Sequence, residues 1–155
     1  MKCDLERLLP HRAPMLLITD IESVDFQTET LVARVDVKET DVLYQKSMGG
    51  VPSWVGLEYM AQAIGCFVGL QDLEKNPDAS PGVGFVLGSR NIDVEIPVFK
   101  VNQSYFVRVQ SLFNDDNIAS FDCVIYNDKN QNVAVGALNV FRPDDINDFM
   151  EGRNE

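Results

Sequence analysis

The sequence predicts an α+β fold in which an antiparallel sheet curls around one long buried helix. Two strand-like segments come first, one long apolar helical run follows, and four more strand-like segments complete the order. Strands that follow one another across short polar turns pair as antiparallel neighbours. A chain of 155 residues is long enough for one domain with its own core and hardly long enough for two.

The first elements lie before residue 40. Residues 3–9 predict one or two helical turns that end at Pro10, because proline cannot continue a helix. The segments 15–25 and 30–38 are expected to be strands, and the second alternates apolar and polar residues with a period of two. The polar residues 27–29 between them predict a hairpin turn.

One long helix is expected over residues 54–70, after a loop at 39–51, and Pro52 and Ser53 predict its start. It is apolar on nearly every face, which is typical of a helix enclosed on most sides. Small residues recur every four positions along one side of it, at Ala61, Gly65 and Gly69. We therefore expect another segment of the chain to approach this side closely.

A loop at 73–82 separates the helix from the remaining strands. Four strands are expected after it, at residues 83–96, 104–113, 119–127 and 132–141. We place a single domain over residues 1–142. Residues 143–155 hold five acidic residues against one basic residue, which predicts a solvated acidic tail.

The charged residues exclude two classes of function. The chain holds 24 acidic residues, 13 basic residues and one histidine, for a formal net charge of −11. A protein that binds nucleic acid without sequence preference needs a basic surface, so we expect no nucleic-acid partner. No His, Cys, Asp or Glu cluster has the spacing of metal ligands, so the sequence predicts no metal site and no cofactor.

The cysteines and the apolar runs favour a cytoplasmic protein. Cys3, Cys66 and Cys123 have no short spacing, which fits neither a disulfide framework nor a zinc site and suits a reducing compartment. The longest apolar stretch, 54–70, contains Glu58 and Gln62 and is shorter than the roughly 20 apolar residues of a membrane span. We therefore expect no membrane insertion.

Glu58 is the residue of the helix that most needs an explanation, because a buried carboxylate without a partner is costly. In one interpretation it faces solvent near the helix start, where the helix dipole favours a negative charge. In the other it lines a closed apolar pocket and is poised for proton transfer. Gln62 lies four residues further on the same face and is expected to hold the carboxyl by a hydrogen bond.

Three other features are interpreted as structural. His11 lies in a proline-flanked turn, and Cys66 has no histidine or basic residue near it in the sequence. The glycines of residues 82–88 precede a strand, whereas a nucleotide-binding loop precedes a helix. We expect structural roles for His11 and Cys66, and no nucleotide site at residues 82–88.

Two segments together resemble the β-hydroxyacyl-acyl-carrier-protein dehydratases. Residues 8–21, LLPHRAPMLLITDI, are similar to the opening of these enzymes, and residues 51–65, VPSWVGLEYMAQAIG, are similar to their helix with its glutamate. Residues 84–98, GFVLGSRNIDVEIPV, give a weaker third match. The resemblance covers about residues 5–142 and points to a bacterial subgroup found with aryl-polyene pigment clusters.

This resemblance implies a hotdog fold, a six-stranded antiparallel sheet wrapped around one central helix, paired as a dimer. The implied substrate is a 3-hydroxyacyl chain on acyl carrier protein, in fatty-acid or aryl-polyene biosynthesis. In the family a histidine takes the C2 proton, while a glutamate of the neighbouring subunit helps to expel the hydroxyl as water. Glu58 matches this glutamate, with Gln62 beside it. The backbone N–H groups of Ser53 and Trp54 would bind the thioester carbonyl.

The sequence departs from the family where the catalytic histidine is expected. That histidine belongs to a G-H-F-P motif before the helix, whereas residues 41–52 read DVLYQKSMGGVP and contain no histidine. An ungapped count back from Glu58 places Tyr44 at this position. His11 matches another histidine of the family, in the N-terminal P-H-R-x-P motif, which is not the catalytic one. Loss of a general base typically costs about 10²–10⁴-fold in rate.

Three functions therefore stay open. The chain is a dehydratase or dehydratase-like subunit that supplies Glu58 within a homodimer, or within a heterodimer with a histidine-bearing relative. Alternatively, it is a hotdog acyl thioesterase in which Glu58 activates water. The third alternative is a non-catalytic acyl-binding protein. In the first, the partner that supplies the substrate is an acyl carrier protein.

Overall fold

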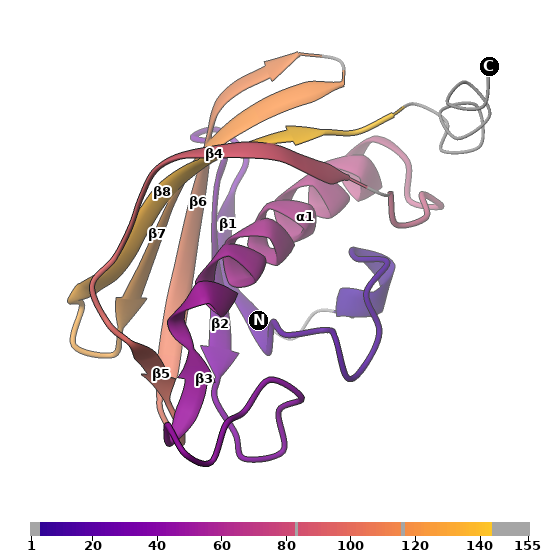
Figure 1. The fold of residues 1–155 in the computed structure, drawn as a ribbon. Coiled ribbons are helices and arrows are strands. Elements are labelled where there is room, and N and C mark those ends of the chain that lie inside the picture. The colour runs from indigo at the N-terminus through magenta and orange to yellow at the C-terminus, as the bar shows by residue number, and fades with distance from the viewer. Residues whose placement is uncertain (1–3, 83, 116, 144–155) are drawn as a thin grey trace, which may run out of the picture.

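The computed structural model describes residues 4–82, 84–115 and 117–143. A six-stranded antiparallel sheet wraps around one long helix, α1 (Gly56–Lys75), which lies in its concave face (Figure 1). This arrangement confirms the predicted fold class. Cys3 and all of the predicted acidic tail except Pro143 lie outside the described residues.

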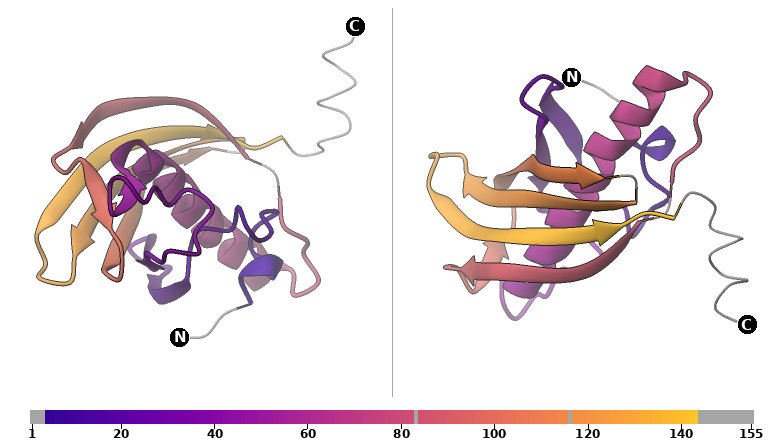
Figure 2. Two further views of the ribbon diagram at one scale, coloured as in Figure 1. Left: turned by 60° about the horizontal axis from the view of Figure 1, so that its bottom comes forward. Right: turned by 90° about the horizontal axis from the view of Figure 1, so that it is seen from above.

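The large sheet has its six strands in the order β1-β2-β6-β7-β8-β4. Their bounds are β1 (Asp20–Asp25), β2 (Thr30–Asp36), β4 (Phe85–Val94), β6 (Ser104–Asp115), β7 (Ile118–Asn127) and β8 (Asn132–Phe141). β1 and β2 form the predicted hairpin, and β6, β7 and β8 pair successively as a meander. The two views of Figure 2 show the sheet curving around α1.

A second sheet, which the sequence pattern does not predict, joins β3 (Gly50–Pro52) to β5 (Val98–Lys100). Residues 50–51 fall in the loop predicted at 39–51, and β5 falls between the strands predicted at 83–96 and 104–113, because three residues are too few to show a period of two. A Cβ atom at Gly50 would lie 2.1 Å from the carbonyl oxygen of Phe99. The pairing therefore requires a glycine at this position.

The helix begins and ends later than predicted. A 3-10 turn, η2 (Ser53–Val55), precedes α1, and neither Pro52 nor Val55 caps these elements with a side-chain hydrogen bond. The N–H of Ser53 instead donates to the carbonyl of Pro97 over 3.2 Å. At its other end α1 continues to Lys75 and so includes residues 73–75, the beginning of the predicted loop at 73–82.

The N-terminal segment forms the predicted short helix, as one 3-10 turn, η1 (Leu5–Arg7), but its first strand is shorter than predicted. β1 starts only at Asp20. The Thr19 N–H already donates to the Arg34 carbonyl of β2 over 2.8 Å, whereas residues 15–17 do not join the strand, because the Gln62 side chain of α1 binds the Met15 carbonyl and the Leu17 N–H. These bonds hold the segment against the helix instead of in the sheet.

The core lies between α1 and the concave face of the sheet. Phe67 of α1 meets Phe121 of β7 edge to face, with ring centroids 6.1 Å apart, and Tyr59 meets Phe99 at 5.1 Å. Such aromatic contacts add to the burial of apolar area that stabilises the fold. No helix among the described residues is long and apolar enough to cross a membrane.

The stripe of small residues on α1 does admit another segment, as predicted. A Cβ at Gly69 would lie 2.7 Å from the Leu8 carbonyl oxygen, and one at Gly65 would lie 2.6 Å from Leu9 Cδ2. Leu8 and Leu9 are both buried. The N-terminal segment therefore packs directly on the helix, and this contact builds one wall of the site described below.

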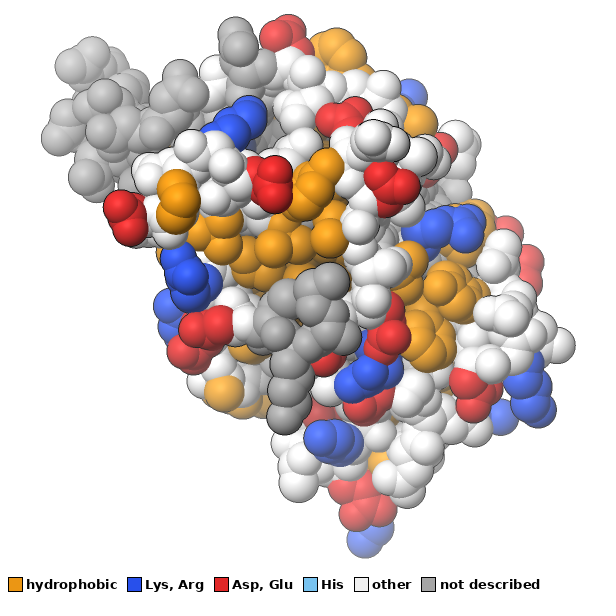
Figure 3. Space-filling view, turned by 180° about the vertical axis from the view of Figure 1, so that it is seen from behind, with side chains coloured by type: hydrophobic (Ala, Val, Ile, Leu, Met, Phe, Trp, Pro, Cys, Tyr) orange, Lys and Arg blue, Asp and Glu red, His pale blue; other side chains and the backbone are white. Residues whose placement is uncertain are grey.

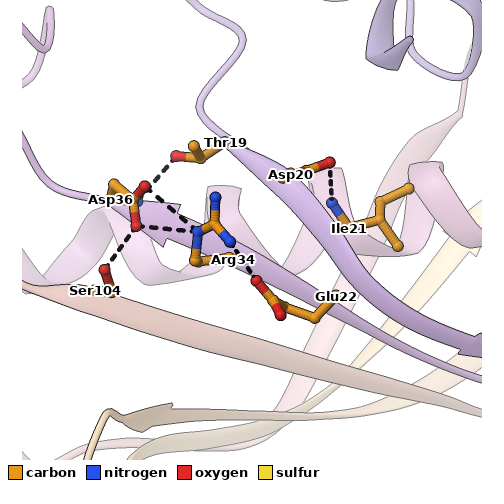
Figure 4. A network of polar contacts seen from close by, with 7 residues as sticks. All are labelled: Thr19, Asp20, Ile21, Glu22, Arg34, Asp36 and Ser104. Carbon is orange, nitrogen blue, oxygen red and sulfur yellow. Dashed lines mark hydrogen bonds and ion pairs between the residues drawn. The ribbon is translucent and has the colours of Figure 1, made fainter. Parts of the chain in front are cut away.

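A polar network fixes the register of the strands at the β1 end of the sheet (Figure 4). Ser104 donates to Asp36 over 2.6 Å, and the N–H of Asp36 donates to Thr19 over 2.9 Å. Arg34 pairs with Asp36 and with Glu22. The hydrogen bond that Arg34 donates to the Glu22 carboxylate favours the charged guanidinium and raises the pKa of Arg34. The network joins β1, β2 and β6.

Candidate functional site

A cavity of about 320 Å³ runs along α1. Ala61, Gly65 and Gly69 form its floor, and residues 8–11 of the N-terminal segment line one wall. The beginning of β4 and the end of β8 contribute Val86 and Val140. From Glu58 at one end to Asp72 at the other, the helix extends about 21 Å at a rise of about 1.5 Å per residue. The space is long, narrow and mostly apolar, which suits an extended hydrocarbon chain.

The carboxylate of Glu58 is held by Gln62, as the sequence predicts. Gln62 is fully buried, and its Nε2 donates to Glu58 Oε1 over 2.9 Å. The same Nε2 donates to the Met15 carbonyl over 2.9 Å, while Gln62 Oε1 accepts from the Leu17 N–H over 2.8 Å. Both amide donors are thereby used, so the amide has one orientation and presents one N–H to Glu58.

His11, interpreted above as structural, lies beside Glu58. Its Nε2 is 3.5 Å from Glu58 Oε1, and the two side chains are 34% and 38% exposed. His11 Nδ1 is buried and has no hydrogen-bond partner within the described part of the chain. The sequence did hold a signal for this contact, because His11 lies in one of the two motifs that carry the family resemblance and Glu58 lies in the other.

Glu58 combines the two interpretations considered for it. It lies in the first turn of α1 and is partly exposed, where the positive end of the helix dipole favours a carboxylate. It also lines the cavity, at the end that His11 and Pro10 share. An acid at this position reaches both solvent and an apolar chamber, which is the placement that proton exchange with a bound molecule requires.

Three of the sequence-predicted site residues lie outside the cavity lining of this single chain. Tyr44 is half-buried in the loop before β3, and its N–H donates to the Asp41 carbonyl over 3.0 Å. The Ser53 N–H is bound to the Pro97 carbonyl, and Trp54 is 63% exposed. The structure thus brings Glu58, Gln62 and His11 together, without Tyr44, Ser53 or Trp54.

The other reactive side chains are buried away from this cavity. Burial, with a smaller contribution from Asp122, raises the pKa of Cys123 to about 12, and burial also raises the pKa of Tyr59. Cys66 is buried too, as expected for a packing residue. In the described ranges no three His, Cys, Asp or Glu side chains gather closely enough to hold a metal ion. Glu58 and His11 are therefore the groups to which chemistry at this end of the cavity can be assigned, whereas Asp72 and Arg142 line the other end.

Comparison with protein families and curated sequences gives consistent results. The family model for ApeP-like proteins, described as ApeP dehydratase, matches residues 3–151. A 3-hydroxyacyl-[acyl-carrier-protein] dehydratase FabZ of Chlamydia trachomatis serovar L2 is 34% identical over 98 residues, which cover 61% of this chain and 62% of the relative. The FabZ of Chlamydia muridarum is 33% identical over 98 residues with the same coverage. The match thus spans less than two thirds of these relatives.

Solved structures support the same fold. The dehydratase heterocomplex ApeI:P from Xenorhabdus doucetiae contains a chain with a TM-score of 0.89 and 25% identity, with 100% of both chains covered. The Escherichia coli PaaI protein from the phenylacetic acid degradation operon has a TM-score of 0.60 at 15% identity, over 79% of this chain and 82% of its own. A hypothetical thioesterase from Streptococcus pneumoniae with coenzyme A gives 0.59 at 15%, over 80% and 84%. The last two establish the hotdog fold alone.

Proposed function

The chain belongs to the ApeP-like dehydratase family, and from this membership we propose that it supplies one half of a site that removes water from 3-hydroxyacyl chains on acyl carrier protein. The observation that carries the proposal is the buried Gln62 amide, which holds the Glu58 carboxyl at one end of a long apolar cavity. We place the reaction in fatty-acid or aryl-polyene biosynthesis, and in the cytoplasm, where the buried thiols of Cys66 and Cys123 suit a reducing compartment.

The roles follow from the chemistry of dehydration. A base removes the C2 proton, the electron pair of that C–H bond forms the C2=C3 double bond, and the C3 hydroxyl leaves with its own electron pair. Glu58 gives a proton to this hydroxyl, so that it departs as water. The apolar cavity along α1 holds the acyl chain. The backbone N–H of Trp54, in η2, is the proposed donor to the thioester carbonyl. The backbone N–H of Ser53 is not proposed because it already donates to the Pro97 carbonyl.

The base comes from a second hotdog subunit in this proposal. Residues 41–52 contain no histidine, and an ungapped count back from Glu58 leads to Tyr44. The Nε2 of the chain's one histidine, His11, faces Glu58, so we assign it to positioning that carboxyl. The similar structure from Xenorhabdus doucetiae is described as a heterocomplex, which supports a heterodimer over a homodimer.

The surface has the features of a protein that joins another subunit. β4 is an edge strand of the large sheet, and its Leu87 is 61% exposed. Leu87 lines a shallow hollow with Leu112, Phe113 and Ile118. On the rear face, hydrophobic side chains form two groups, one to the left and one to the right of the centre, with charged side chains near both (Figure 3). Exposed apolar patches and unpaired strand edges mark surfaces that associate with other chains.

The test mixes the purified chain with a hotdog dehydratase that carries the histidine loop. A series of 3-hydroxyacyl chains on acyl carrier protein is supplied, and loss of water from the carrier-bound chain is followed by mass spectrometry. The mixture is expected to be active and the chain alone inactive. Glu58→Gln should lower the activity of the mixture by about 100-fold or more, whereas Glu74→Gln, an exposed carboxylate of the same helix, should not. Equal activity of the Glu58→Gln and wild-type mixtures would overturn the proposal.

The same assay separates the two alternatives. Release of free thiol by the chain alone, lost in Glu58→Gln, would identify an acyl thioesterase instead of a dehydratase subunit. Binding of acyl-pantetheine without either reaction would identify a non-catalytic acyl-binding protein. Native mass spectrometry of the chain with and without the histidine-bearing protein distinguishes the heterodimer from the homodimer.

A further inference from the structure

We propose that the ion pair between Asp72 and Arg142 closes the far end of the cavity and limits the length of the acyl chain that it accepts. The inference rests on the proposed function in one respect, namely that the occupant of the cavity is an acyl chain. It concerns the end of the cavity opposite Glu58, where neither the sequence motifs nor the family resemblance places a functional residue.

The two charged residues meet across the end of the cavity. Asp72 lies in the last turns of α1, and Arg142 directly follows β8. The guanidinium Nη2 of Arg142 pairs with Asp72 Oδ2, and both residues line the cavity. Their side chains are 35% and 25% exposed, so the pair lies mostly below the surface. The ion pair thus bridges the helix and the sheet where the apolar lining ends.

Arg142 is fixed in this position by contacts on both its backbone and its side chain. Its N–H donates to the Asn117 carbonyl over 2.7 Å, and its own carbonyl accepts from Asn117 Nδ2 over 2.7 Å. A Cβ at Gly82 would lie 2.3 Å from Arg142 Nη2. The guanidinium therefore lies in space that a side chain at position 82 would fill, and the glycine leaves this space free.

A charged pair at this point opposes a hydrocarbon chain in two ways. The lining is apolar along Val68, Gly69, Val86 and Val140, so each methylene that enters gains from leaving water. A chain that reaches Asp72 and Arg142 must separate them or bury their charges beside methylenes without compensating hydrogen bonds, and both are unfavourable. Affinity should therefore rise with chain length until the terminal methyl reaches the pair, and then stop rising.

The experiment measures binding, so that it does not depend on catalysis. Dissociation constants of non-hydrolysable acyl-pantetheine amides of increasing length are determined for the wild-type chain in its complex with the histidine-bearing subunit, and for Arg142→Ala and Asp72→Asn. In the wild-type complex the gain of about fourfold per methylene should end at one length. In both variants it should continue for at least the next two methylenes, while short chains bind as before.

Two further variants sharpen the result. Arg142→Lys keeps a cation at the position and should keep the length limit. Asp72→Arg and Arg142→Asp, each alone, should lift the length limit. The double variant that combines them restores an ion pair of reversed direction and should restore the limit. Thermal unfolding of each variant shows that it is folded, and Asp72→Asn preserves the size of the side chain.

An unchanged length limit in folded Arg142→Ala and Asp72→Asn complexes would overturn the closing role and leave the dehydratase proposal intact. If no acyl-pantetheine amide of any length binds the wild-type complex, the cavity is not an acyl site, and both proposals fall together.

Discussion

Gln62 Nε2 lies 2.9 Å from Glu58 Oε1, and the same amide group binds the backbone of residues 15 and 17. One fully buried side chain therefore joins the proposed acid to the N-terminal segment that carries His11. The geometry of the site depends on the packing of this segment against α1, because Gln62 and His11 approach Glu58 from two parts of the chain.

Replacing Gln62 by leucine should lower both stability and activity. The substitution keeps a similar volume, but it leaves the Leu17 N–H and the Met15 carbonyl without the partner shown here. These two bonds are part-buried, so leaving their backbone groups unpaired should cost at most about 1–3 kcal/mol each in the free energy of unfolding, which urea unfolding measures. Gln27→Leu, in the exposed β1–β2 turn, is the control. Equal unfolding midpoints for the Gln62 variant and the wild type would contradict the prediction.

His11 should position Glu58 instead of acting on the substrate. Removal of the ring in His11→Ala frees the carboxylate 3.5 Å away, and the kcat of the mixed complex is expected to fall by up to about 100-fold, as misplaced catalytic groups do. KM should change little, because His11 makes no proposed contact with the thioester. His11→Gln keeps a donor near the position of Nε2 and should recover part of kcat. A loss confined to KM, with kcat unchanged, would contradict this role.

Local patterns explain how much of the fold the sequence could predict. In β6 every second residue is buried, at Tyr105, Val107 and Val109, and the residues between them are more exposed. The long apolar run of α1 is typical of a buried helix. The pattern misled at the start of α1, where Pro52 and Ser53 resemble a helix start but Pro52 pairs with Val98 of β5 and the Ser53 N–H binds Pro97. A short strand pairing of this kind has no periodic signal.

The site shows the same division between local and distant contacts. Glu58 and Gln62 are four residues apart on one helix, so their hydrogen bond follows from helix geometry. The contact between His11 and Glu58, and that between Asp72 and Arg142, join segments far apart in the chain. Their residue types fit an ion pair, but only the folding of the sheet around α1 brings them together.

A methyl group added at Gly69 should destabilise the protein. In Gly69→Ala the new Cβ would lie 2.7 Å from the Leu8 carbonyl oxygen and 2.9 Å from the Leu8 Cα, so the N-terminal segment must move away from the helix. Overpacking of this kind costs about 1–3 kcal/mol in stability. The replacement of glycine by alanine gains about 1 kcal/mol in helix propensity, so a net loss is expected when the overpacking cost lies in the upper part of its range. Thermal unfolding measures the net loss.

The matched control is Gly88→Ala in β4, where a Cβ would meet no atom within 4 Å. This variant should unfold at or above the wild-type temperature. A Gly69→Ala protein as stable as Gly88→Ala would show that Leu8 does not pack against the helix as described.

Alkaline pH should weaken the fold through Cys123. Burial raises the pKa of this thiol from 9.0 to about 12, so the folded protein retains a proton that the unfolded chain releases above about pH 9. The stabilisation is therefore fully present below pH 9 and is lost as the pH rises toward 12, at up to about 1.4 kcal/mol per pH unit for this group.

Cys123→Ala lacks the thiol and also leaves a small cavity, whose cost does not depend on pH. Tyr59 and Tyr105, whose pKa values burial also raises, are present in both proteins and cancel in the comparison. The difference in unfolding free energy between wild type and variant, measured by urea unfolding, should stay constant to about pH 8 and shrink at about pH 10. A constant difference over that range would show that the thiol is solvated in the folded protein.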